Sequence, residues 1–172
     1  MELRLIRHAA AAERGPAFPD DTQRPLVAKG ERQASMLAES LGREGVRVDL
    51  LASSPWLRAW QTASALAPLL TMGEPLALPE LAQGDPERTA AALAAASGGG
   101  PTATVSEIVV AVGHEPWLSQ LAAHLLGADE VASAIVFRKA AVMTLTGALR
   151  GGGMRLEAFV PMRVRRPLHR SR

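Results

Sequence analysis

The stretch Met1-Glu2-Leu3-Arg4-Leu5-Ile6-Arg7-His8 decides the fold of this chain. Its short apolar run predicts a buried β-strand over residues 2–7, followed by a loop over residues 9–23 that contains proline, glycine and aspartate. His8 should therefore emerge where the strand leaves the core. A neutral imidazole can attack phosphorus and a neighbouring guanidinium can hold phosphate oxygens, so the pair Arg7-His8 indicates phosphoryl transfer.

Strands and helices are expected to alternate along the rest of the chain. Apolar residues three and four apart predict helices, and the run from Glu107 to Gly113, apolar on both faces, is typical of a central parallel strand. The predicted strands are 2–7, 46–53, 75–79, 107–113, 142–146 and 154–160, and the predicted helices are 29–44, 54–70, 85–96 and 115–126. This alternation predicts an α/β fold, a three-layer α/β/α sandwich with a mostly parallel central sheet. We expect a single domain over residues 1–162 and a basic C-terminal tail over residues 163–172.

Three chemically interesting side chains follow predicted strands. His8 follows the first strand, Arg58 lies in the first turn of the helix after the second, and His114 directly follows the central strand. Ligands of such sheets bind beyond the carboxyl ends of the strands, so these residues should meet at one edge. A cation in the first turn of a helix opposes the helix dipole, which favours an anion beside Arg58.

Composition narrows the possible functions. The chain has no cysteine, which excludes a disulfide framework, a cysteine nucleophile and thiolate metal ligands. Its net charge is +2, but the last ten residues carry five arginines and no acid, which leaves −3 (2 − 5) for the remainder. A slightly acidic body argues against nucleic acid, and we expect the tail to be a solvated end. Without a signal peptide or an apolar run of about 20 residues, a cytoplasmic protein with no membrane partner is expected.

Three motifs together resemble the histidine phosphatase superfamily, in its phosphoglycerate mutase-like branch. They are Arg7-His8, Ser53-Ser54-Pro55-Trp56-Leu57-Arg58-Ala59-Trp60-Gln61-Thr62, and Val112-Gly113-His114-Glu115-Pro116. The short chain, Arg24-Pro25-Leu26, and Leu78-Pro79-Glu80-Leu81 followed by Gly84-Asp85 are similar to the SixA-type phosphohistidine phosphatases. The resemblance covers residues 1 to 160 and implies a phosphoglycerate mutase-like fold.

The resemblance also implies catalytic roles. His8 would be the nucleophile that becomes a phosphohistidine intermediate. Arg7, Arg58 and His114 would surround the phosphate, and Arg24 would reach it from the first loop. Arginine suits this role because its planar guanidinium binds phosphate oxygens in pairs.

Three other positions bear on substrate binding and proton transfer. Glu80 is the candidate substrate-binding acid that would protonate the leaving group, with Asp85 and Glu115 as alternatives. The family usually has glycine where this chain has Ala9, and alanine tolerates a positive φ poorly. The pair Arg138-Lys139 lies between apolar segments and could face the substrate, but a solvated turn is the preferred expectation.

These features favour a metal-independent phosphatase without a cofactor, acting on phosphohistidine in a protein. Metal chemistry lacks ligands here, because the sequence offers no His-x-x-x-His, no Asp-x-Asp and no glutamate-rich cluster. The insertions that cover the site in mutases are missing, which implies an open site. Two alternatives stay open: a phosphatase of a small phosphomonoester, such as a sugar or nucleotide phosphate, and a non-catalytic module that binds phosphate or a phosphoprotein. Nucleic-acid binding through the tail ranks last, and the sequence does not indicate an oligomeric state.

Overall fold

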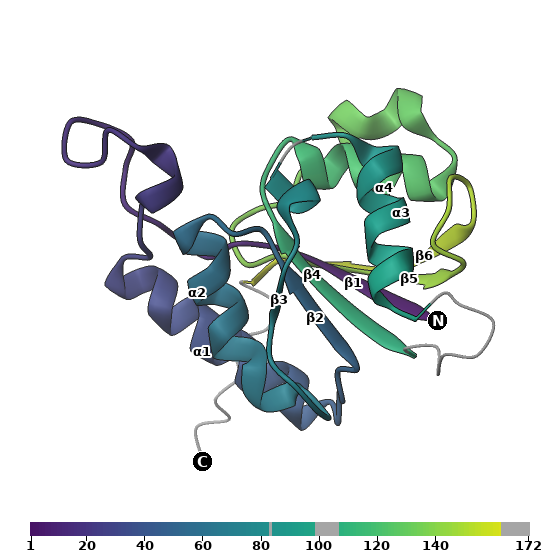
Figure 1. Ribbon diagram of the computed structural model, residues 1–172, viewed down its shortest axis with the longest axis horizontal. Coiled ribbons are helices and arrows are strands. Elements are labelled where there is room, and N and C mark those ends of the chain that lie inside the picture. Colours follow the sequence, from purple (N-terminus) through teal and green to yellow (C-terminus); the bar gives the residue numbers. More distant parts are fainter. Residues whose placement is uncertain (83, 99–106, 163–172) are drawn as a thin grey trace, which may run out of the picture.

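Six strands form a single sheet in the computed structural model, which describes residues 1–82, 84–98 and 107–162. The strand order is β3-β2-β4-β1-β5-β6 (Figure 1). The strands are β1 Glu2–Arg7, β2 Leu50–Ser53, β3 Leu76–Ala77, β4 Ile108–Gly113, β5 Val142–Gly147 and β6 Met154–Val160. The N-terminal strand predicted from the sequence is confirmed at both ends, and it lies inside the sheet between β4 and β5.

The first four strands run in parallel and the last two alternate in direction. β1 pairs in parallel with β4, Leu3 opposite Val109, and antiparallel with β5, Ile6 opposite Val142. β2 is parallel to both β3 and β4, and β6 is antiparallel to β5. The predicted mostly parallel sheet is therefore confirmed. Because β5 is antiparallel to β1, it begins at the edge of the sheet where β1 ends.

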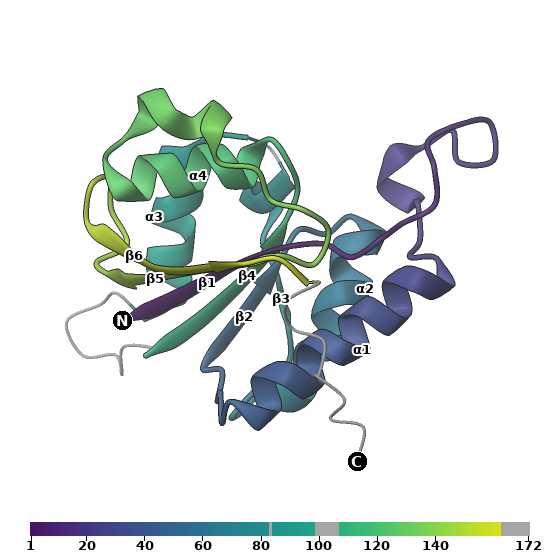
Figure 2. The same ribbon diagram turned by 180° about the vertical axis from the view of Figure 1, so that it is seen from behind.

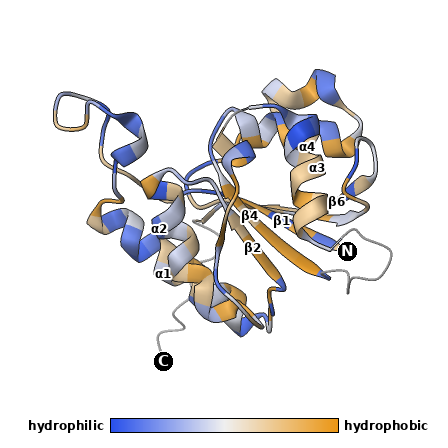
Figure 3. Cartoon of the chain, in the orientation of Figure 1, coloured by the Kyte–Doolittle hydropathy of each residue, from blue (hydrophilic) through white to orange (hydrophobic). Residues whose placement is uncertain are grey.

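Two pairs of helices cover the two faces of the sheet (Figures 1 and 2). Helices α1 (Ala28–Arg43) and α2 (Leu57–Leu66) pack together on one face, and α3 (Pro86–Ala96) and α4 (Trp117–Leu126) pack together on the other. Each face has its own apolar cluster. Strands β2 and β4 are apolar along their length because both of their faces are covered (Figure 3). The predicted three-layer sandwich is confirmed.

Short 3₁₀ helices fill several connections, and several element boundaries differ from the prediction. The 3₁₀ segments are η1 Asp21–Gln23, η2 Ala67–Leu69, η3 Pro79–Ala82 and η4 Asp129–Ala134. β3 is shorter than the predicted 75–79, α2 ends at Leu66 rather than at residue 70, and α4 begins at Trp117 rather than at residue 115. The second strand begins at Leu50 rather than Val46, although Val48 still forms an isolated bridge to Leu70. Helix α2 begins at Leu57 rather than Ser54, and its N-cap residue is Trp56. The Ser54 hydroxyl bonds instead to His114, the residue after β4, and accepts from Trp56 N.

The loop after β1 is held against the start of α1. Val27 N donates to Ala10 O at 3.1 Å, and a Cβ at Gly30 would lie 1.8 Å from that same oxygen. Glycine is required at position 30 for this close approach. The loop that carries several candidate site residues is thus packed on a helix rather than free.

The basic tail, residues 163–172, lies outside the described residues. Within the described ranges, none of the helices has the length and apolar character needed to cross a bilayer.

Candidate active site

His8 stands at the carboxyl end of β1 with its ring almost completely buried. Its Nδ1 lies 2.8 Å from the carbonyl oxygen of Ala9, which can only accept a hydrogen bond. Nδ1 must therefore carry the proton in the neutral ring, and the lone pair is left on Nε2. The backbone thus selects the tautomer that is ready to act as a nucleophile.

Two cationic side chains converge on this nitrogen. The Nε of Arg58, from the first turn of α2, lies 3.2 Å from His8 Nε2, and the Nζ of Lys139 lies 3.1 Å from the same atom. The prediction that Arg58 and His8 meet is confirmed by this contact. The prediction that Lys139 belongs to a solvated turn is wrong, because this half-buried side chain reaches the centre of the site.

The environment keeps His8 neutral. Burial, together with the nearby charges of Lys139 and His114, lowers the pKa of His8 to about 2. A hydrogen bond to the Ala9 carbonyl acts in the opposite direction but is outweighed. At neutral pH the ring is therefore an uncharged imidazole, the form that can attack phosphorus.

The position of Lys139 depends on an unusual backbone conformation at the next residue. Ala140 has φ = 57° and is the sole non-glycine with positive φ in the described part of the chain. Its N–H donates to Arg7 O at 3.0 Å, and Arg7 N donates to Ala141 O at 3.2 Å. This left-handed turn joins the segment before β5 to the end of β1. Such strain costs about 1–3 kcal/mol and is typical of functional sites.

His114 joins the site from the end of β4. Its ring centroid lies 5.0 Å from that of His8, and its Nε2 lies 2.8 Å from Ser54 Oγ. Burial, together with the charge of Arg58, lowers the pKa of His114 to about 3. Its Nδ1 is buried and has no partner among the described residues. A buried polar atom without a partner calls for a missing group, and a phosphate oxygen would supply one.

Arg7 flanks the site on another side. Its Nη1 donates to Phe137 O at 2.6 Å, while its Nε is buried without a partner in the described ranges. Burial lowers its pKa, against the opposing effect of the Glu115 carboxylate. Its charge also lowers the pKa of Lys139 and His114, which places it within electrostatic range of both.

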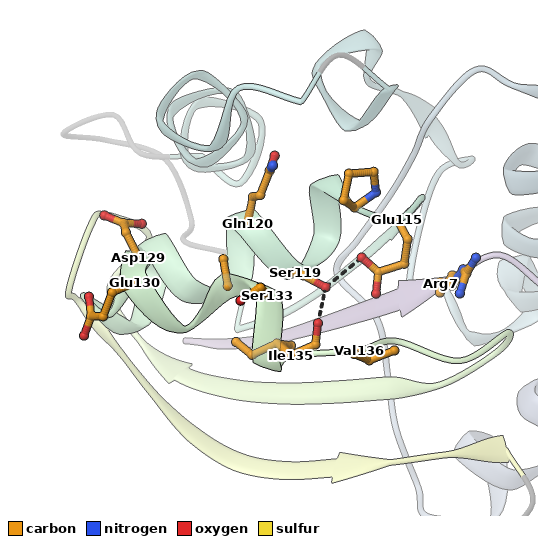
Figure 4. Close-up of a pocket in the computed structure, with 11 residues that line it drawn as sticks. Arg7, Glu115, Ser119, Gln120, Asp129, Glu130, Ser133, Ile135 and Val136 are labelled. Atoms are coloured by element: carbon orange, nitrogen blue, oxygen red, sulfur yellow. Dashed lines mark hydrogen bonds between the residues drawn. The ribbon is translucent and has the colours of Figure 1, made fainter.

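The Glu115 carboxylate holds the wall of a pocket beside Arg7 (Figure 4). Phe137 N donates to Glu115 Oε1 at 2.5 Å, and Ser119 Oγ lies 2.6 Å from Glu115 Oε2. Ser119 Oγ is also 2.6 Å from Ile135 O. The pocket has a volume of about 570 Å³. Both carboxylate oxygens are therefore engaged in holding the segment before β5, which gives Glu115 a structural task.

Asp21 organises the arginines of the first loop. Its Oδ2 accepts from Arg58 Nη2 at 2.9 Å, its backbone oxygen accepts from Arg58 Nη1 at 2.6 Å, and its Oδ1 accepts from Arg24 Nε at 2.7 Å. Hydrogen bonds from Arg14, Arg24 and Arg58 hold the pKa of Asp21 well below its usual range. Sequence reasoning missed Asp21, although its position three residues before Arg24 was a usable signal.

Arg24 lies beside the site without touching His8. Its Nη1 donates to Ala12 O at 2.6 Å, and its charge lowers the pKa of Arg58 and Lys139. Its role as a phosphate ligand stays a prediction.

The other acids lie near α3. Glu80 is in η3, where its backbone oxygen accepts from Thr89, and Asp85 caps α3 through Arg88 N at 3.0 Å. Within the described ranges, no hydrogen bond or ion pair joins the Glu80 carboxylate to His8 or its cations. Those ranges also hold no group of three or more His, Asp or Glu side chains placed to bind a metal ion.

Ala9 fits without strain where the family usually has glycine. It is completely buried in the α1–α2 cluster, and its N–H donates to Thr62 Oγ1 at 3.1 Å. Its φ is not positive. The expected conflict between alanine and a left-handed backbone is therefore absent at this position.

Comparison with known proteins agrees with this geometry. The family model of the histidine phosphatase superfamily (branch 1) matches residues 3–94, more than half of the chain. The chain belongs to this superfamily, as the three motifs predicted. An uncharacterized protein of Picosynechococcus is 42% identical over 67 residues, but that match covers 39% of this chain and 40% of the relative.

Solved structures extend the match over nearly the whole fold. The protein histidine phosphatase SixA in complex with tungstate has a TM-score of 0.79 and 25% identity, over 95% of this chain and 99% of that one. A mycobacterial glucosyl-3-phosphoglycerate phosphatase in complex with VO3 has a TM-score of 0.68 and 18% identity, over 93% of this chain and 99% of that one. Family and neighbours together support a phosphatase with the phosphoglycerate mutase-like fold.

Proposed function

We propose that this protein is a metal-independent phosphatase that moves a phosphoryl group from a protein histidine to His8 and then to water. The observation that carries the proposal is the environment of His8 Nε2, which lies within 3.2 Å of Arg58 Nε and 3.1 Å of Lys139 Nζ. The ring is neutral, so a lone pair faces two cationic donors. This arrangement suits an anionic phosphoryl group, which the cations would attract and Nε2 would attack.

The proposed reaction has two steps. His8 Nε2 forms a bond to phosphorus while the bond between phosphorus and the leaving group breaks, and the leaving group takes up a proton. Water then attacks phosphorus, the bond to Nε2 breaks, and inorganic phosphate leaves with the imidazole restored. Phosphoryl transfer requires the attacking and leaving atoms to lie roughly in line, with three oxygens spread around the equator.

Geometry suggests what each cation does in these steps. A donor 3.1 Å from the attacking nitrogen lies on the nucleophile's side of phosphorus, so Lys139 is suited to an equatorial oxygen and not to the leaving group opposite. Arg58 is placed likewise. The unpartnered His114 Nδ1 and Arg7 Nε are further donors for these oxygens. Preorganised donors of this kind lower the barrier by about 3–4 kcal/mol each in comparable sites.

The positions of the Glu115 and Glu80 carboxylates favour phosphohistidine over a phosphate ester as the substrate. Glu115 is committed to Phe137 and Ser119, and the Glu80 carboxylate has no bond to the site in the part of the chain that the structure describes. An alkoxide leaving group needs a positioned acid, whereas an imidazole leaving group can be protonated on its other nitrogen. The similarity to a protein histidine phosphatase supports the same choice. The similarity to a phosphatase of a small phosphorylated molecule keeps the ester alternative in the test below.

Single-turnover labelling tests the proposal. Radiolabelled phosphohistidine protein should leave acid-labile, base-stable label on the wild type, with and without a chelator, and His8→Asn should carry none. His124→Asn, which changes a histidine on α4 outside the site, should label normally. Full hydrolysis by His8→Asn would overturn the mechanism. Turnover restricted to small phosphate esters would assign the ester alternative, and binding of vanadate without turnover of any substrate would assign the binding module.

A further inference from the structure

A second cleft of about 580 Å³ lies against Lys139 on the side of α1. Its charged lining consists of Lys29 and Arg32, from the first turns of α1, and Arg138 and Lys139, from the segment before β5. The apolar part of its wall includes Met36 and Met162.

The positive charge in this cleft is not neutralised. No carboxylate lines it, and Lys29, Arg32 and Arg138 form no ion pair within the described ranges. Three other cations are paired, Arg4 with Glu44, Arg14 with Asp21, and Arg43 with Glu39, whereas Arg47 and Arg155, also unpaired within those ranges, line neither this cleft nor the pocket beside Arg7. Three unpaired cations that converge on one hollow repel each other, and an anion in the hollow would relieve that repulsion.

Lys139 connects this cleft to the phosphate site. Its side chain lines the cleft, while its Nζ lies 3.1 Å from His8 Nε2. A substrate whose phosphoryl group meets His8 would therefore extend a neighbouring group along Lys139 into the cleft. The mixture of cations and methionine side chains suits a carboxylate on a methylene stem, as in glutamate.

A second hollow, beside Arg7 on the other side of the phosphate site, indicates that the substrate is long. The pocket beside Arg7, of about 570 Å³, is lined by Asp129 and Glu130 as well as Glu115. The phosphate site thus has a hollow on each flank, basic next to Lys139 and acidic next to Arg7. A small phosphorylated acid would occupy one flank, whereas a polypeptide could occupy both and be oriented by the difference in charge.

We propose that the cleft formed by Lys29, Arg32, Arg138 and Lys139 binds an acidic side chain next to the phosphohistidine of the protein substrate. This rests on the proposed function, because it assumes a phosphohistidine at His8. The ligands for the test are two phosphohistidine peptides that differ only in flanking glutamates or glutamines, and O-phosphoserine as a small phosphorylated acid.

Binding is measured by fluorescence anisotropy at low salt with His8→Ala, which cannot turn the peptides over, and O-phosphoserine by its competition. The glutamate peptide should bind about tenfold more tightly than the glutamine peptide, the combined effect of two or three partly exposed ion pairs. Adding Lys29→Gln and Arg32→Gln should reduce the ratio of the two dissociation constants to about threefold or less, because two of the four cations of the cleft are removed. The matched control, Arg47→Gln with Arg155→Gln, removes two exposed charges elsewhere and should preserve the tenfold ratio.

Each negative result of these binding experiments leads to a different conclusion. Equal binding of the two peptides by His8→Ala, or a tenfold ratio that survives Lys29→Gln with Arg32→Gln, overturns the cleft assignment. Charge-dependent binding confined to O-phosphoserine assigns the cleft to a small substrate and also overturns it. The proposed function fails separately if the wild type hydrolyses neither peptide, since that measurement does not depend on the cleft.

Discussion

Asp21 accepts two hydrogen bonds from the Arg58 guanidinium: its carboxylate Oδ2 lies 2.9 Å from Nη2 and its carbonyl oxygen lies 2.6 Å from Nη1. The third nitrogen of the same guanidinium, Nε, is the one that reaches His8. An aspartate in a 3₁₀ turn of the first loop therefore sets the orientation of the arginine on α2 that contacts His8.

Asp21→Asn should lower kcat about 10- to 100-fold and change KM less than about threefold, because a misaligned Arg58 affects the transition state more than substrate binding. Steady-state kinetics checks this expectation. Asp20→Asn is the matched control, since Asp20 bonds to Thr22 and not to any arginine. A loss of folding stability in Asp21→Asn without a change in kcat would contradict it.

Lys139 should produce an alkaline limit of activity. Burial lowers its pKa to about 8, with added repulsion from Arg7, Arg58 and Arg24. The ammonium that attracts phosphate is lost as pH rises through this value, so kcat/KM of the wild type should fall above about pH 8.

Lys139→Gln should remove that alkaline limb and lower kcat about 10²- to 10³-fold, whereas Lys139→Arg should retain more activity and move the limb beyond pH 10. Arg47→Gln removes an exposed charge between α1 and β2 and should keep the wild-type profile. The same alkaline limb in Lys139→Gln would show that another group is responsible.

The two buried histidines should make the empty site acid-sensitive. The folded pKa values of His8 and His114, about 2 and about 3, lie below the unfolded value of 6.5, so the unfolded chain binds more protons between these limits. Stability should therefore be full above pH 6.5 and decline as pH falls, by up to about 1.4 kcal/mol per pH unit for each ring. Urea unfolding in phosphate-free buffer measures this slope. His8→Asn should reduce it by about one proton, and an unchanged slope would mean that the ring is protonated in the folded state.

Substitutions of Glu115 and of Glu80 should have different effects on stability and on the rate of phosphoryl transfer. Glu115→Gln weakens the charge-assisted hydrogen bond from Phe137 N and should lower the free energy of unfolding by about 1–3 kcal/mol. Glu80→Gln should change neither stability nor the rate on phosphohistidine, since its carboxylate has no bond to the site. Denaturation and single-turnover rates check the two effects. A large rate loss in Glu80→Gln on phosphohistidine would restore it as the proton donor.

The sequence was sufficient for the fold and for the residues that follow parallel strands. His8, Arg58 and His114 were predictable because the carboxyl ends of adjacent parallel strands share one edge, and the structure brings their side chains together. Lys139 was not predictable in this way. It precedes an antiparallel strand, and its placement depends on a left-handed alanine, for which the sequence carries no signal.

Asp21 was missed for a different physical reason. It lies in a loop without periodicity, and its partners come from positions 14, 24 and 58. Ion pairs across such sequence distances are decided by how the loop packs, here on α1 through Gly30 and Ala10. The spacing of Asp21 and Arg24 is a local signal for that one ion pair, but no local pattern of residues encodes the packing that brings Asp21 to Arg58.

Because β5 runs antiparallel to β1, residues of the site come from two kinds of segment, the ends of parallel strands and the segment before an antiparallel strand. His8 and His114 follow the carboxyl ends of the parallel strands β1 and β4, whereas Lys139 lies in the segment just before the start of β5. Changes at the exposed Arg138, next to Lys139, could therefore alter the charge facing the substrate while Lys139 and the strand ends that carry the histidines stay as they are. Selectivity among phosphorylated compounds could diverge on this scaffold without rebuilding the reaction centre.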